Sequence, residues 1–286
     1  MSRFRVDNLV SVPEIGQEIL QDRDLVILDV RQTSKDAPDR DAYLRSHIEG
    51  ALFADLDGDL AGISTGTNGR RPLPTPADFQ KTVRRWGIDS GSSVIVYGAK
   101  GTSAPARAWW LLKWAGVGSV RLLDGGFEAW VAEGGAVEAG DPSPRWLGDF
   151  TIRPGQLRHV EIDDVEALVK RGILLDARPA AKFSGSAEDP GSGHISGAVS
   201  APVYENFDEN GKLKDETWLR ERYRAYGVSA DAETGAYCGT GKAAALEVFV
   251  LATLGIKATL YVGSWSNGSP IRRDPSNGDC GEEKAN

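Results

Sequence analysis

The sequence Leu28-Asp29-Val30-Arg31, followed downstream by His47-Ile48-Glu49-Gly50-Ala51, occurs twice in diverged form. The second copy reads Leu175-Asp176-Ala177-Arg178, and His194-Ile195-Ser196-Gly197-Ala198 follows it at the same spacing. Two later segments also correspond: residues 94–97 match the segment ending at Tyr237, and residues 122–126 match 260–264. A repeat of this kind predicts two diverged copies of one fold in tandem.

Each copy has the pattern of an α/β domain. Short runs rich in Val, Ile and Leu predict buried strands at residues 25–30, 94–97, 120–123, 173–176 and 260–262. Longer apolar segments rich in helix formers predict helices at 104–115 and 243–254. Strands that alternate with helices predict a mainly parallel sheet flanked by helices in each copy. We expect an N-terminal domain at 1–135, a Pro- and Gly-containing linker at 136–158, a C-terminal domain at 159–275 and a polar tail at 276–286.

Length and charge limit the classes of function. The 286 residues suggest about two domains, at roughly 100–200 residues each. The net charge is −8 and the basic residues form no long run, so we expect no nucleic-acid partner. No apolar run approaches the roughly 18 residues of a membrane span, and the first residues lack the apolar core of a signal peptide. We therefore expect a cytoplasmic protein that does not associate with membranes.

The chain has two cysteines, Cys238 and Cys280. Two cysteines cannot make a disulfide framework, and their spacing is not that of metal ligands. We expect neither a metal nor a cofactor. Cys280 lies among carboxylates, in Asp279-Cys280-Gly281-Glu282-Glu283, and we interpret it as incidental.

Cys238 lies where a predicted strand ends and a predicted helix begins, in Cys238-Gly239-Thr240-Gly241-Lys242-Ala243. Ligands of open parallel sheets bind beyond the carboxyl ends of the strands. The two glycines would let backbone amides curl around the sulfur, and these amides and the helix N-terminus would favour the thiolate. Lys242 would add positive charge. Cys238 is thus predicted to be a nucleophile, and the alternative is a buried structural cysteine. Gly98 holds the same place in the first copy, which we therefore expect to lack covalent chemistry.

Taken together, these motifs resemble the tandem-domain rhodanese family of thiosulfate and 3-mercaptopyruvate sulfurtransferases. The resemblance runs from about Leu9 to Ser269 and includes Gly263-Ser264-Trp265, which is similar to the family's closing motif. It implies a small-molecule sulfur donor and a persulfide on Cys238. It also implies transfer of the sulfur to cyanide or to a thiol, for which a thioredoxin-like protein is a candidate.

Within the family, the Cys238-Gly239-Thr240-Gly241 sequence is similar to the mercaptopyruvate type of loop. Thr240 replaces the usual serine and keeps the hydroxyl, whereas Lys242 and Ala243 depart from both types of loop. The resemblance implies that residues 239–243 bind the donor and that the donor is 3-mercaptopyruvate. Thiosulfate is the alternative donor.

Three residues outside the loop match donor-binding or proton-relay positions of the family. Lys182 stands where mercaptopyruvate enzymes have a first substrate-binding arginine, and the second position falls in 188–193, which has no arginine. Asp57 and Thr240 match the ends of an Asp–His–Ser arrangement, with Arg71 at the histidine position. Arg71 cannot act as a base, but it can bind a carboxylate or a sulfonate. We expect Lys182, Arg71 and Asp57 to belong to the donor site.

Other readings stay open at this point. Asp29, Arg31, Asp176 and Arg178 recur in the copy without a cysteine, which favours a structural role such as ion pairing at strand ends. A phosphatase would need an arginine six residues after the cysteine, where Ala244 stands. A non-catalytic sulfur carrier is a third alternative, because Lys182, Arg71 and Lys242 depart from the family pattern.

Overall fold

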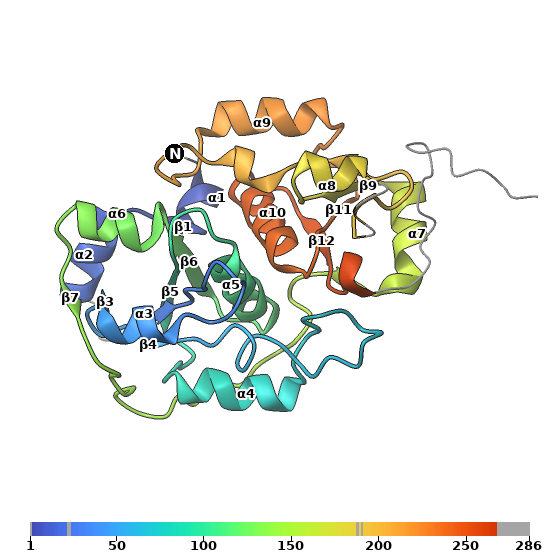
Figure 1. The fold of residues 1–286 in the computed structure, drawn as a ribbon. Coiled ribbons are helices and arrows are strands. Elements are labelled where there is room, and N and C mark those ends of the chain that lie inside the picture. Colours follow the sequence, from blue (N-terminus) through green and yellow to red (C-terminus); the bar gives the residue numbers. More distant parts are fainter. Residues whose placement is uncertain (1, 22–23, 187–188, 190, 268–286) are drawn as a thin grey trace, which may run out of the picture.

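The computed structural model describes residues 2–21, 24–186, 189 and 191–267. The described chain forms two five-stranded sheets and a two-stranded ribbon, with helices around the sheets (Figure 1). Cys280 and the predicted polar tail lie outside the described residues.

The first sheet has the strand order β1-β6-β5-β2-β4, and all its neighbouring strands are parallel. Alternate residues of β5 face opposite sides, since Val94 and Val96 join one apolar cluster while Ile95 and Tyr97 join another. Burial of both faces explains why these strands are continuous apolar runs in the sequence. The strands are β1 (Leu9–Val10), β2 (Leu25–Asp29), β4 (Leu52–Phe53), β5 (Ser93–Tyr97) and β6 (Ser119–Leu123).

The second sheet repeats this arrangement in the order β8-β12-β11-β9-β10, again with all neighbours parallel. Each strand holds the place of its counterpart, so that β11 corresponds to β5 and β9 to β2. This equivalence confirms the internal repeat and the predicted α/β fold of two tandem domains. The strands are β8 (His159–Val160), β9 (Ile173–Asp176), β10 (Val199–Ser200), β11 (Thr234–Tyr237) and β12 (Ala258–Tyr261).

The helices follow the repeat as well. The expected helices at 104–115 and 243–254 are α5 and α10, and the strand and helix ends lie within two residues of the predicted ones. Equivalent helices α4 and α9 begin with equivalent caps, in which Thr75 and Asp215 each accept from a backbone amide three residues on. The helices are α1 (Arg3–Val6), α2 (Val12–Gln21), α3 (Arg40–Arg45), α4 (Pro76–Arg85), α5 (Ala104–Trp114), α6 (Gly126–Ala132), α7 (Ile162–Arg171), α8 (Ala180–Ser184), α9 (Glu216–Ala225) and α10 (Lys242–Thr253), and the 3₁₀ helices are η1 (Val203–Asn206) and η2 (Trp265–Asn267).

Helices α5 and α10 pack against each other between the two sheets (Figure 1). Nearly every side chain of both helices is buried, which is why neither has a polar face in the sequence. Trp109 of α5 meets Phe249 of α10 edge to face, with ring centroids 5.3 Å apart. The apolar core is therefore continuous across the interface. The loop before each helix contacts the other domain.

The segment after the first domain runs along that domain before it reaches the second sheet. It begins with β7 (Val137–Glu138), which pairs antiparallel with β3 (His47–Ile48). Further on, the Arg153 amide donates to the Ala115 carbonyl at 2.7 Å, and β8 follows a few residues later.

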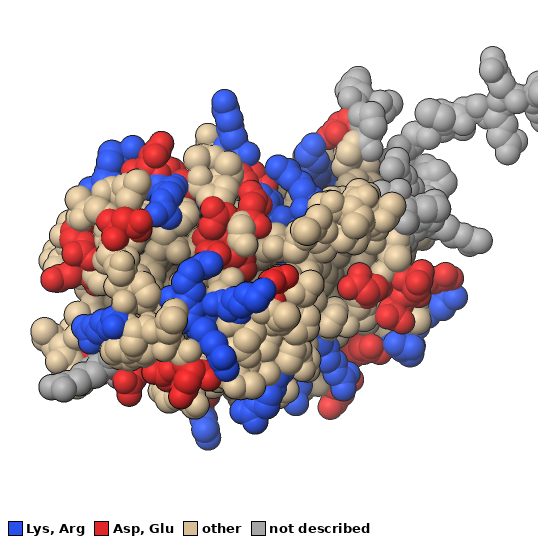
Figure 2. Space-filling view, turned by 90° about the horizontal axis from the view of Figure 1, so that it is seen from below, with Lys and Arg blue, Asp and Glu red and all other residues tan. Residues whose placement is uncertain are grey.

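Acidic and basic side chains are interspersed on the face of the molecule drawn in Figure 2. Among the helices of the described residues, none combines the length and the apolar character needed to cross a membrane.

Candidate active site

Cys238 comes directly after β11, and the four-residue segment 238–241, called here the Cys238 loop, leads into α10. The side chain is 2% exposed. The Gly241 amide donates to the Cys238 Sγ atom at 3.1 Å. Gly241 has φ +85°, a left-handed conformation that favours glycine, and a Cβ atom there would lie 3.0 Å from the Val262 carbonyl oxygen. The sulfur thus accepts from a backbone amide at the start of a helix, an arrangement that stabilises an anion.

The first glycine of the loop, Gly239, does not have the predicted role. Gly239 is not among the described residues whose backbone is left-handed, and a Cβ atom there would meet no atom within 4 Å. The expectation that both glycines need special backbone angles is therefore wrong for Gly239. Only Gly241 has the conformation that turns an amide toward the sulfur.

The Gly263-Ser264-Trp265 sequence holds the Cys238 loop in place. The Ser264 hydroxyl accepts from the Cys238 amide at 3.2 Å, and the Trp265 amide donates to the Cys238 carbonyl at 2.9 Å. Both backbone groups of Cys238 are therefore held by this segment, which leaves the sulfur as the group that faces the loop amide.

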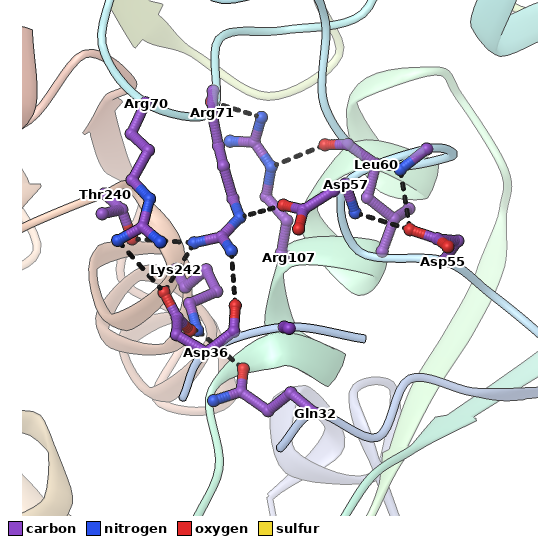
Figure 3. Close-up of polar contacts among 12 residues, drawn as sticks. Gln32, Asp36, Asp55, Asp57, Leu60, Arg70, Arg71, Arg107, Thr240 and Lys242 are labelled. Carbon is purple, nitrogen blue, oxygen red and sulfur yellow. Dashed lines mark hydrogen bonds and ion pairs between the residues drawn. The ribbon is translucent and has the colours of Figure 1, made fainter. Parts of the chain in front are cut away.

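Arg71 of the first domain reaches into the site between two carboxylates (Figure 3). Its Nε donates to Asp57 Oδ1 at 2.7 Å, and its Nη1 donates to Asp36 Oδ2 at 2.8 Å. Nη1 also lies 3.5 Å from the Thr240 hydroxyl of the second domain. The structure therefore brings together Asp57, Arg71 and Thr240, which the sequence matched to one arrangement.

Lys242 takes part in the same contacts but not in the way expected. Its Nζ forms an ion pair with Asp36 and donates to Gln32 Oε1 at 2.6 Å (Figure 3). Burial lowers the pKa of Lys242, and the Asp36 carboxylate opposes that effect. The positive charge that Lys242 was expected to add is thus paired with a carboxylate of the first domain.

Asp36 connects these groups and has an unusual backbone. It has φ +68°, and its carboxylate meets Arg71 and Lys242 through different oxygens. Burial alone would raise the pKa of Asp36, but hydrogen bonds from Lys242 and Arg71 outweigh it and hold the pKa below its ordinary value. We refer to Gln32, Asp36, Asp57, Arg71 and Lys242 as the interface cluster.

Two other predicted residues lie outside this cluster. Ala243 is in the first turn of α10 and half-buried. Lys182 is on α8, which follows β9, and its half-exposed side chain forms an ion pair with Asp189. No hydrogen bond or ion pair joins Lys182 to the interface cluster within the described chain. The described residues also contain no group of three or more His, Cys, Asp and Glu side chains that could hold a metal ion.

Sequence reasoning missed three residues beside the Cys238 loop: Gln32, Asp36 and Arg107. Arg107 is on α5, and its side chain is completely buried at the interface with α10. Its signal in the sequence was an arginine inside an otherwise apolar helix, at 104–115. Gln32 and Asp36 lie in an ordinary polar loop, and nothing in their sequence separates them from solvent-facing residues.

The repeated Asp-x-Arg motifs form ion pairs at the ends of equivalent strands, as expected. Arg31 pairs with Asp29 at 2.8 Å, and Arg178 pairs with Asp176 at 2.5 Å. In both domains a tyrosine hydroxyl next to this pair accepts from a backbone amide, at Ile48 and at Ile195. The equal geometry in both copies supports a structural role.

The loop after β5 is closed by its own helix and by the second domain. A Cβ atom at Gly98 would lie 2.6 Å from Pro105 Cγ. Lys100 donates to the Glu209 carbonyl at 3.2 Å, and the Asp124 carboxylate accepts from the Leu213 amide at 2.8 Å. A cysteine at position 98 would thus overlap Pro105 at the start of α5 unless the loop moved.

The rhodanese-like domain family matches the chain twice, over residues 12–133 and 161–269. SseB of Mycobacterium tuberculosis, provisionally named as a thiosulfate sulfurtransferase, is 36% identical over 266 residues, which are 91% of this chain and 93% of that protein. A Pseudomonas aeruginosa protein named as a probable 3-mercaptopyruvate sulfurtransferase is 40% identical over 258 residues, 86% of this chain and 90% of that protein.

Among solved structures, that of the 3-mercaptopyruvate sulfotransferase SseA from Escherichia coli is similar, with a TM-score of 0.80 and 30% sequence identity. The similarity covers 90% of this chain and 98% of that one. The protein belongs to the rhodanese family and is a sulfurtransferase with two tandem rhodanese domains.

Proposed function

We propose that Cys238 is the nucleophile that accepts sulfur from 3-mercaptopyruvate as a persulfide and passes it to a thiol or to cyanide. The observation that carries this proposal is the 3.1 Å hydrogen bond from the Gly241 amide to the Cys238 sulfur at the start of α10. A thiolate is the reactive form of cysteine, and an amide donor at a helix N-terminus stabilises it.

The reaction balances with this one nucleophile. The Cys238 thiolate attacks the donor sulfur, the carbon–sulfur bond breaks, and its electron pair stays on carbon as an enolate. The proton of the donor thiol moves to that carbon, which gives pyruvate and leaves a persulfide anion on Cys238. An acceptor thiolate then attacks the outer sulfur of the protonated persulfide and releases the Cys238 thiolate.

The other predicted site residues receive supporting roles. Gly239, Thr240, Gly241 and the first turn of α10 with Lys242 and Ala243 form the side of the site next to the sulfur, and the Thr240 hydroxyl is the group that hydrogen-bonds the donor. Arg71, which Asp57 orients, and Lys182 supply positive charge for the donor carboxylate. Lysine binds a carboxylate as a point charge, so the donor should saturate this site less readily than a site with two arginines.

Thiosulfate is the second candidate donor. Lys242, Arg71 and Lys182 are all paired with carboxylates. Thiosulfate is a compact dianion that does not need two parallel hydrogen bonds from one guanidinium. It competes with these carboxylates through its charge alone. We favour 3-mercaptopyruvate because the segment Gly239–Gly241 carries no bulky cation directly after the cysteine, which leaves room for a carbon-bearing donor.

The test compares kcat/KM for the two donors and measures persulfide on intact protein by mass spectrometry. We expect a higher kcat/KM with 3-mercaptopyruvate and a mass increase of one sulfur on the wild-type chain. Cys238→Ser should lose both signals, whereas the matched control Cys280→Ser should keep them. Activity in Cys238→Ser would refute the site, and a kcat/KM about tenfold higher with thiosulfate would reverse the choice of donor. A chain that carries persulfide but turns over neither donor would be a sulfur carrier.

Three further expectations stay predictions. They are the domain boundaries at 1–135 and 159–275 around a linker at 136–158, the cytoplasmic location, and a thioredoxin-like thiol acceptor. They rest on the sequence and on the resemblance to the family.

A further inference from the structure

Arg107 lies in an unusual position for an arginine. Its side chain is 0% exposed, on a helix of the first domain that packs against α10 of the second. Within the described chain it forms no ion pair with a carboxylate, unlike the buried Arg31, Arg71 and Arg178. A buried charge without a partner costs several kcal/mol, so a structure rarely keeps one without a counter-charge.

The hydrogen bonds of Arg107 use only part of its guanidinium. Nε donates to the Leu60 carbonyl at 3.2 Å (Figure 3), and Nη2 donates to the carbonyls of Arg71 and Pro72, both at 3.1 Å. Nη1 is shielded from solvent and has no hydrogen-bond partner among the described residues. Neutral donors could hold the three carbonyls equally well, so these contacts do not account for the charge.

The unpaired nitrogen points toward the Cys238 loop. Nη1 lies 3.6 Å from the position that a Cβ atom on Gly241 would occupy, and the Gly241 amide donates to the Cys238 sulfur. Burial lowers the pKa of Arg107 to about 10, and the negative charge of Cys238 opposes this effect. Arg107 is thus still charged near neutral pH, and it faces the segment that surrounds the sulfur.

We propose that Arg107 is a positioning residue whose charge, supplied by the first domain, stabilises the Cys238 thiolate of the second. The inference rests on the proposed role of Cys238. It gives the first domain, which has no cysteine of its own, a direct part in the chemistry. Lys242 and Tyr204 also lie within the electrostatic reach of the sulfur, but Lys242 is paired with Asp36 and Tyr204 donates to Ser103.

The experiment measures the rate at which iodoacetamide alkylates Cys238 in a Cys280→Ser background. The protein with Arg107 is compared with two variants. Arg107→Met removes the charge, whereas Arg107→Lys keeps the charge but loses the planar set of guanidinium donors. At about pH 7, Arg107→Met should be alkylated roughly tenfold more slowly, and Arg107→Lys should recover most of the rate.

Equal alkylation rates in wild type and Arg107→Met at neutral pH would overturn the inference, as would a Lys variant as slow as the Met variant. The proposed function is refuted by a different result, namely that wild-type protein forms no persulfide with either donor. If Arg107→Met does not fold, the test compares the unfolding temperatures of Cys238→Asp and Cys238→Asn in the wild-type background. Cys238→Asp should unfold at the higher temperature near pH 7, and the opposite order would refute a counter-charge at this place.

Discussion

Arg71 holds Asp36 by two contacts, from Nη1 to the carboxylate at 2.8 Å and from Nη2 to the backbone carbonyl at 2.7 Å. Both residues belong to the first domain, yet they meet beside Thr240 and Lys242 of the second. The cations beside the candidate nucleophile are thus partly neutralised by a carboxylate of the same chain. An anionic donor has to compete with Asp36 for them.

Asp36→Asn should therefore lower KM for an anionic donor. The change removes one negative charge beside Arg71 and Lys242, and asparagine tolerates the left-handed φ of +68° at this position. We expect KM to fall about threefold or more, with a smaller change in kcat, because the effect is on donor binding. Steady-state kinetics with 3-mercaptopyruvate and thiosulfate measure it.

Asp141→Asn is the matched control, since Asp141 pairs with Arg40 in an exposed position outside the interface cluster. Its KM should equal that of the wild type. A KM that rises in Asp36→Asn would mean that Asp36 orients the cations for the donor instead of competing with it.

Glu247 should make stability depend on pH. It is completely buried on α10, and burial raises its pKa to about 8, against the opposing effects of Tyr223 and Arg222. A raised carboxyl pKa means that the folded state binds a proton between about pH 4.5 and pH 8 that the unfolded state has lost. The free energy of unfolding should then fall as pH rises through this range.

Glu247→Gln should remove much of this dependence, because the amide is neutral at every pH. Urea unfolding at about pH 5.5 and pH 8 measures the difference, and the variant should be the more stable protein at the higher pH. The exposed Glu166, paired with Lys170, provides the control Glu166→Gln, which should keep the wild-type pH dependence. An unchanged slope in Glu247→Gln would show that the buried carboxyl does not cause it.

A cysteine at position 98 should not create a second active site. The added Cβ atom would lie 2.6 Å from Pro105 Cγ at the start of α5, so the loop would have to move. In a Cys238→Ser background, Gly98→Cys should form no stable persulfide and should unfold at a lower temperature. Gly91→Cys is the control for stability, since a Cβ atom there meets nothing within 4 Å. A stable persulfide on the Gly98→Cys variant in that background, measured by mass spectrometry, would contradict this account.

The sequence was informative where it repeats. Two diverged copies with equal spacing of Asp29 to His47 and of Asp176 to His194 predicted two equivalent parallel sheets, because the motifs lie at equivalent strand ends. Buried strands and the helices α5 and α10 were predictable because their apolar runs have no polar face.

The sequence was less informative where the domains face each other. Asp57, Arg71 and Thr240 were grouped through a resemblance, and no pattern of spacing links residues of two domains. Asp36 was missed because its role comes from an interdomain contact with Lys242, and periodicity describes only contacts within an element. Gly239 was misjudged because two glycines around Thr240 suggest two special conformations, whereas the turn needs one.

Lys182→Ala should raise KM for an anionic donor more than it lowers kcat. Lys182 lies on α8, which follows β9, and β9 pairs with β11 so that the strand ends before Arg178 and Cys238 are neighbours. Its ion pair with Asp189 is half-exposed, and exposed ion pairs contribute little to stability, so its loss should leave the unfolding temperature nearly unchanged. A lysine that binds the donor acts equally on ground state and transition state, so the expected change is a KM about threefold or more higher at similar kcat. Lys170→Ala, which breaks the exposed pair with Glu166 on α7, is the control and should keep the wild-type KM. If KM stayed unchanged for both donors in Lys182→Ala, Lys182 would be a surface residue held by Asp189, and the donor would depend on Arg71 and Lys242 alone.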